Sequence, residues 1–155
     1  LNLQTRKTAL RYLADGGAIG IFPGGTVSTA TKPFNQPMDP GWRSFTARMI
    51  GKSNATVVPI YFDGHNSRLF QWASHMSIEL RLALIFREVK RRVCTAVPVH
   101  IGETLTPDIL ASAGKRQELM NFLRDQTYQM APSQQQASIA RAHKRFQDSK
   151  PAIFH

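Results

Sequence analysis

An apolar run that ends in two glycines, residues 18–28, constrains the fold of this chain more than any other stretch. The run at 18–22 is short and bounded by glycines, which predicts a buried β-strand. Pro23 cannot donate to a sheet ladder, and Gly24 and Gly25 allow the backbone to turn tightly. Ligands of α/β proteins bind beyond the carboxyl ends of strands. The stretch therefore predicts an anion-binding loop or, as the plain alternative, a strand-to-loop turn.

The amino-acid sequence of this stretch resembles a motif of a known protein family. Residues 22–28 are similar to the Phe-Pro-Glu-Gly-Thr-Arg-Ser block of the lysophospholipid and glycerol-phosphate acyltransferases, and residues 58–60 resemble that family's later Val-Pro block. Residues 45–48 and 61–70 resemble the bacterial hemolysin-like branch, so the resemblance covers roughly residues 5–128. The order and spacing of both blocks make the match more specific than the first block alone.

The resemblance implies transfer of a fatty acyl group to a lysolipid-type acceptor. The implied donor is acyl-CoA or acyl-carrier protein, with no further cofactor. Gly24 and Val27 stand where the family has Glu and Arg, two side chains that help to hold a phosphorylated acceptor. A positive charge from a neighbouring segment could replace that Arg. The expected substrate-binding residues are Phe22, Pro23, Gly24, Gly25, Thr26, Ser28, Val58 and Pro59, together with Lys32, Arg43 and Arg48.

The catalytic pair that the family carries is missing from its expected place. In the family, this pair forms the motif His-x-x-x-x-Asp, which precedes the Phe-Pro-Glu-Gly block. The His acts as the general base, and the Asp orients the His. No histidine precedes His65 here. The same spacing occurs at His143 and Asp148, in the polar tail, and we treat this match as a coincidence of a short motif. We therefore expect no catalytic residue in this chain, and the histidines and the single cysteine show no metal-binding spacing.

Charge points to anionic partners. The chain has 155 residues and a formal net charge of +10, with one dense basic cluster at residues 87–92. Such a charge favours anionic lipid, acidic carrier proteins or nucleic acid. Nucleic acid is the weakest of these, because no zinc-finger or RNP motif accompanies the charge. We expect a cytoplasmic protein at the periphery of the inner membrane, since no apolar run reaches about 18 residues and the lone Cys94 fits a reducing compartment.

The overall pattern predicts an α/β fold with a mixed, mostly parallel sheet flanked by helices. The chain starts with Leu1 in what reads as mid-domain, so we expect a fold truncated at its amino end. The expected parts are an acyltransferase-like domain over residues 1–128 and a polar basic tail or extra helix over 129–155. Predicted strands lie at 18–22, 55–62 and 95–102, and predicted helices at 5–13, 39–51, 66–76, 77–92 and 115–128.

Two other functions fit the same sequence. A catalytically silent lipid- or membrane-binding module is the first, because residues 77–92 combine an apolar face with a basic end, as membrane-surface helices do. A core-packed helix with a solvated basic end explains that segment equally simply. The second is a basic nucleic-acid-binding domain, which salt-sensitive binding to duplex DNA would support.

Overall fold

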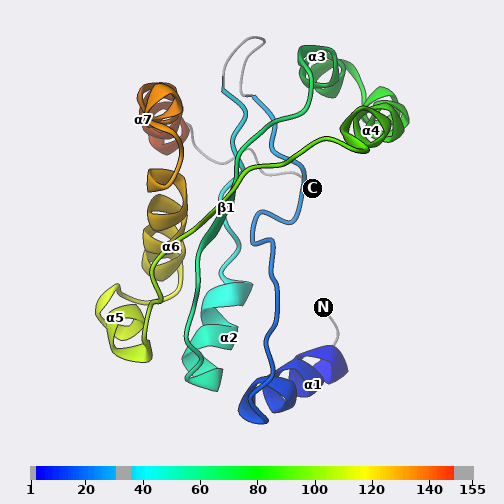
Figure 1. The fold of residues 1–155 in the computed structure, drawn as a ribbon. Helices are drawn as coiled ribbons and strands as arrows, with labels where there is room; N and C mark the ends of the chain where they lie inside the picture. The colour runs from blue at the N-terminus through cyan, green and yellow to red at the C-terminus, as the bar shows by residue number, and fades with distance from the viewer. Residues whose placement is uncertain (1–2, 31–35, 149–155) are drawn as a thin grey trace. The chain divides into compact units, whose positions relative to one another are not determined.

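The computed structural model describes residues 3–30 and 36–148 and is 54% helical (Figure 1). Its helices are α1 (Leu3–Ala14), α2 (Phe45–Ser53), α3 (Arg68–Met76), α4 (Ile78–Arg92), α5 (Pro107–Ser112), α6 (Gln117–Gln129) and α7 (Ser133–Asp148). Its strands are β1 (Ile60–Phe62) and β2 (Val99–Ile101). The chain forms two compact units, which consist of Leu1–Thr26, Gly41–Tyr61 and Ile101–Met130 in unit 1 and Val27–Pro40, Phe62–His100 and Ala131–His155 in unit 2.

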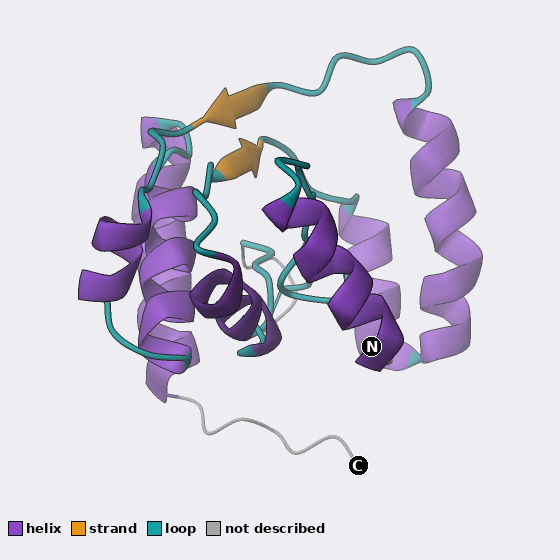
Figure 2. Cartoon of the chain, turned by 90° about the horizontal axis from the view of Figure 1, so that it is seen from below, coloured by secondary structure: helices purple, strands orange, loops and turns teal. Residues whose placement is uncertain are grey.

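The predicted α/β architecture is wrong. In place of a mostly parallel sheet, β1 and β2 form a two-stranded antiparallel sheet, whose arrows run in opposite directions in Figure 2. The predicted strand at residues 18–22 is absent, and its Phe22 side chain is 80% exposed. A strand is defined by a neighbour to which its backbone bonds. The apolar run predicted burial, but no partner strand pairs with it among the described residues.

Unit 1 has an apolar core built around α6. Met120 is fully buried there, and the cluster around it consists of Trp42, Ala47, Leu105, Leu110, Leu119 and Leu123. Helix α2 packs against both α1 and α6. The Arg6 guanidinium lies 5.1 Å from the centre of the Phe45 ring, a cation–π contact between α1 and α2.

Short backbone ladders join two distant segments of unit 1. Val57 and Leu105 exchange hydrogen bonds of 2.9 and 2.8 Å, and the Gly102 N–H donates to the Pro59 carbonyl at 2.9 Å. A Cβ at Gly102 would lie 2.7 Å from the Met130 sulfur and 2.9 Å from Pro59 Cγ. The close approach of these segments therefore requires glycine at this position. Of the predicted strand at 55–62, only β1 and the Val57 bridge form.

Unit 2 contains the helical hairpin α3–α4, which lies side by side in both views, and helix α7 (Figures 1 and 2). Phe70 and Ala73 bury one side of α3. The Ala30 N–H donates to the buried Gln71 side-chain oxygen at 2.9 Å, which ties the backbone at Ala30 to α3. In α7, the Gln135 amide donates to the Asp63 carboxylate at 2.8 Å.

The predicted helices are largely confirmed. Ser67 caps α3 by accepting from the Phe70 N–H, and Ser77 caps α4 by accepting from the Leu80 N–H. The helix predicted from Asp39 starts later, at Phe45, and the Asp39 carboxylate instead accepts a hydrogen bond from the Ser28 hydroxyl. A capping residue that finds another partner no longer defines a helix start. Within the predicted tail or extra helix at 129–155, the residues Ser133–Asp148 form helix α7.

Candidate functional site

The segment from Phe22 to Gly25 forms a hydrogen-bonded turn in unit 1. The Gly25 N–H donates to the Phe22 carbonyl at 3.1 Å. Proline in the second position and glycine in the fourth favour such a turn. Gly25 has a φ of +66°, in the left-handed region that glycine adopts without strain. The sequence Phe-Pro-Gly-Gly therefore fixes this turn locally, without help from a sheet.

Arg43 lies against the open side of the turn. Its backbone N–H donates to the Pro23 carbonyl at 3.2 Å. Its side chain is adjacent as well, because a Cβ built at Gly25 would lie 3.6 Å from the Arg43 Nε and 3.7 Å from its Cζ. Arg43 is exposed. The arrangement places a solvent-accessible guanidinium beside the two-glycine turn, which is a geometry suited to an anion.

The other expected site residues have varied surroundings. In unit 1, Thr26 is exposed next to the turn, Arg48 is exposed on α2, Val58 is half-exposed, and Pro59 is buried beside Gly102. In unit 2, the Ser28 hydroxyl donates to Asp39. Lys32 lies outside the described residues. The structure thus brings together Phe22, Pro23, Gly24, Gly25 and Arg43, and it engages the hydroxyl of Ser28 elsewhere.

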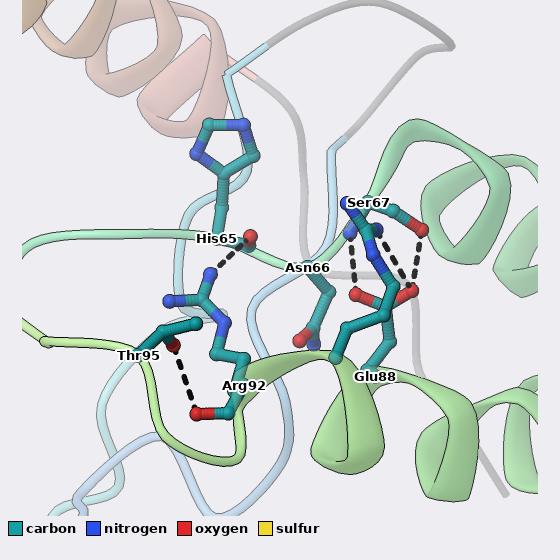
Figure 3. A pocket seen from close by; sticks show the side chains of 7 residues that line it. His65, Asn66, Ser67, Glu88, Arg92 and Thr95 are labelled. Atoms are coloured by element: carbon teal, nitrogen blue, oxygen red, sulfur yellow. Dashed lines mark hydrogen bonds and ion pairs between the residues drawn. The ribbon is translucent and has the colours of Figure 1, made fainter.

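A second cluster of charged side chains surrounds an open hollow of about 300 Å³ in unit 2 (Figure 3). The hollow is lined by His65, Asn66, Ser67, Glu88, Arg91, Arg92 and Thr95. Figure 3 shows the Ser67–Glu88 hydrogen bonds on one side of it and Arg92 on the other. The side chains come from the loop before α3 and from the last turn of α4 and the residues that follow it.

Glu88 is the central group of this cluster. Its carboxylate is buried and accepts from the Ser67 backbone N–H at 2.8 Å and from the Ser67 hydroxyl at 2.5 Å. The Arg91 Nη1 lies 3.7 Å from the Glu88 Oε1, which forms an ion pair. Burial raises the pKa of Glu88, but the hydrogen bonds from Ser67 and the positive charges of Arg91 and Arg87 outweigh it, so that the pKa lies below its ordinary value. Glu88 is therefore a structural anion that ties α4 to the cap of α3.

Arg92 closes the other side of the hollow. Its Nη2 donates to the His65 carbonyl at 2.6 Å. Gly64 has a φ of +137°, and a Cβ there would lie 2.9 Å from the Arg92 Nη1. In the sequence, Arg92 belongs to the basic cluster at 87–92, and no catalytic motif marks His65. Glu88 could have been noticed because it is the one acidic residue within the run 87–92.

The remaining candidates are the His143–Asp148 pair and possible metal ligands. His143 and Asp148 both fall within α7, and only the backbone is described at these two positions. Within residues 3–30 and 36–148, no three His, Cys, Asp or Glu side chains gather as a metal site would require. No helix in this part of the chain has the length and apolar character needed to cross a bilayer.

Comparison with known proteins adds no assignment. No protein-family model, curated protein or solved structure matches this chain significantly.

Proposed function

We propose that this chain is the acceptor- and phosphate-binding portion of a bacterial acyltransferase. The reaction would move a fatty acyl group from acyl-CoA or acyl-carrier protein to a lysolipid-type acceptor. The proposal rests on the resemblance of residues 22–28 and 58–60 to the lysophospholipid acyltransferase blocks. It assigns binding, and no catalytic step, to the residues described here.

The observation that supports the proposal best is the position of Arg43. The family's Arg is replaced by Val27, yet the Arg43 guanidinium lies against Gly25 of the turn. A guanidinium is permanently charged and can bond two phosphate oxygens at once. Arg43 can therefore supply, from the segment just before α2, the charge that the turn itself lacks. The Gly25 N–H is engaged within the turn and Gly24 is buried, so the proposal depends on the charge of Arg43 and not on the N–H groups of the turn.

The test is a calorimetric titration of the chain with inorganic phosphate and, separately, with a short-chain lysophosphatidic acid. Arg43→Gln should weaken binding because it removes one charge-assisted contact, worth about 1.5–3 kcal/mol. Arg11→Gln is the matched control, since Arg11 is also an exposed arginine of unit 1, in the last turn of α1. Equal affinities for the two variants would show that the turn is not the anion site.

One observation favours the second candidate, a catalytically silent lipid-binding module. Helix α4 exposes a row of large apolar side chains, which a lipid surface could cover. A silent module would bind lipid whether or not it binds a soluble phosphate. The two functions share a lipid partner and differ in the acceptor site: phosphate binding that Arg43→Gln weakens favours the acyltransferase portion, whereas lipid binding by a parent chain that does not bind phosphate favours the silent module.

A further inference from the structure

Helix α4 carries an exposed apolar stripe along one face. The stripe consists of Ile78, Leu82, Phe86 and Val89 of the helix and of Val93, the residue that follows its end, at intervals of three or four residues. Such spacing places side chains on a single helix face. The five side chains are 71, 57, 79, 61 and 63% exposed, so none of them belongs to the core of unit 2. Contiguous apolar surface of this kind marks a binding face more often than scattered exposed residues do.

Helix α3 of the same hairpin also exposes apolar side chains. Leu69, Trp72 and Met76 share a face of α3 by the same spacing and are 43, 53 and 57% exposed. Different residues, Phe70 and Ala73, are buried. Both helices thus keep a second apolar face after the hairpin has packed. Tryptophan beside such a face is typical of segments that lie at a membrane–water interface.

The charge around the stripe is positive. Residues 68–93 contain six Lys and Arg side chains and two acidic ones. One of the two acids, Glu88, is buried and bonded to Ser67 and Arg91. Arg87, Lys90 and Arg91 are exposed on the last turns of α4. A surface that combines an apolar stripe with a net positive charge matches the acidic headgroups and acyl chains of an anionic bilayer.

We propose that α4 docks in the interface of a membrane that contains acidic lipids, with the stripe Ile78–Val93 turned toward the acyl chains. The helix lies in the plane of the membrane. It is 15 residues long and its last turn holds three cations, which suits an interfacial helix and not a spanning one. A second copy of the chain is the less suitable occupant, because it would bring an equally positive hairpin against this one.

This docking is independent of the proposed acceptor site, since it uses unit 2 and the acceptor site lies in unit 1. It also holds for a catalytically silent module. The two proposals can therefore fail separately: Arg43→Gln should leave membrane docking intact, and Phe86→Ser should leave binding of soluble phosphate intact.

The test is sedimentation of the full chain with vesicles of phosphatidylcholine alone and with vesicles of about one third phosphatidylglycerol. The chain should sediment with the acidic vesicles, less so in high salt, and hardly with the neutral ones. Phe86→Ser combined with Ile78→Thr should weaken binding about tenfold or more, because two exposed apolar groups no longer enter the interface. Circular dichroism confirms that each variant keeps its helices.

Two matched controls locate the effect. Ile101→Thr changes an isoleucine of β2 that is 72% exposed, against 71% for Ile78, and should not alter binding. Lys90→Gln should weaken binding to the acidic vesicles, whereas Lys52→Gln, at the end of α2, should not. The proposal is overturned if Ile78→Thr and Ile101→Thr behave alike, or if the parent chain ignores acidic vesicles. A dimer that Phe86→Ser dissociates, in a chain that ignores vesicles, would assign the stripe to a second copy instead.

Discussion

The hydroxyl of Ser67 is the point at which one substitution should destabilise unit 2 most clearly. It caps α3 by accepting from the Phe70 N–H at 3.3 Å, and it donates to the buried Glu88 carboxylate. A helix cap contributes about 1 kcal/mol, and a hydrogen bond to a charged group about 1.5–3 kcal/mol. Ser67→Ala should therefore lower the free energy of unfolding by about 2.5–4 kcal/mol at neutral pH.

Ser77→Ala provides the matched control. Ser77 also caps its helix, α4, because its hydroxyl accepts a hydrogen bond from the Leu80 N–H. The carboxylate that its hydroxyl bonds, Glu79, is exposed, whereas Glu88 is buried. That substitution should cost about 1 kcal/mol. The measurement is urea denaturation of each variant, followed by circular dichroism and compared at constant m-value. The excess cost of Ser67→Ala over Ser77→Ala measures the bond to Glu88.

The excess should depend on pH. The pKa of Glu88 in the folded chain is below its ordinary value of 4.5, so the ionised carboxylate stabilises the fold above the unfolded pKa. That contribution is lost as the pH falls through the lowered pKa. Glu88→Gln should remove this part of the acid sensitivity. If Ser67→Ala costs no more than Ser77→Ala at neutral pH, the reasoning about Glu88 is refuted.

Two further predictions concern backbone space and the core. Gly64→Ala should destabilise the chain by about 1–3 kcal/mol in the same urea assay, because the φ of +137° is strained for alanine and the new Cβ would lie 2.9 Å from the Arg92 Nη1. Gly20→Ala is the control, because a Cβ there meets nothing within 4 Å. An equal effect of the two substitutions would contradict the prediction. Met120→Ala should cost about 2–5 kcal/mol, since Met120 is fully buried in the core of unit 1, and a loss below about 1 kcal/mol would show that this core can collapse around the cavity.

Sequence patterns identified the helices because helix signals are local. The apolar spacing of α3 and α4 extends over a few residues, and their serine caps, Ser67 and Ser77, bond the N–H groups of residues three positions later. Gly16, just after α1, has a φ of +82°, the left-handed conformation that favours glycine at the end of a helix. The turn at 22–25 was also readable, since Pro23 and Gly25 favour it without any distant contact.

The sheet could not be predicted in the same way. The run at 18–22 has the composition of a buried strand, yet Phe22 is 80% exposed and no partner pairs with the run among the described residues. The run at 55–62 keeps only three residues as a strand. Apolar composition indicates that burying a segment is favourable in free energy. Whether the segment pairs as a strand depends on which other segment lies beside it in the fold.

For the candidate site, the sequence determined the turn and nominated three cations, Lys32, Arg43 and Arg48. Only the tertiary structure decided that Arg43 lies against Gly25, because that contact joins segments about 18 residues apart. Only the structure showed that α4 exposes an apolar face to solvent. It also showed that Glu88 is the anion that bonds the last turns of α4 to Ser67. Local bonds fix turns and caps from neighbouring residues, but burial and charge pairing are set by whatever part of the chain arrives from elsewhere.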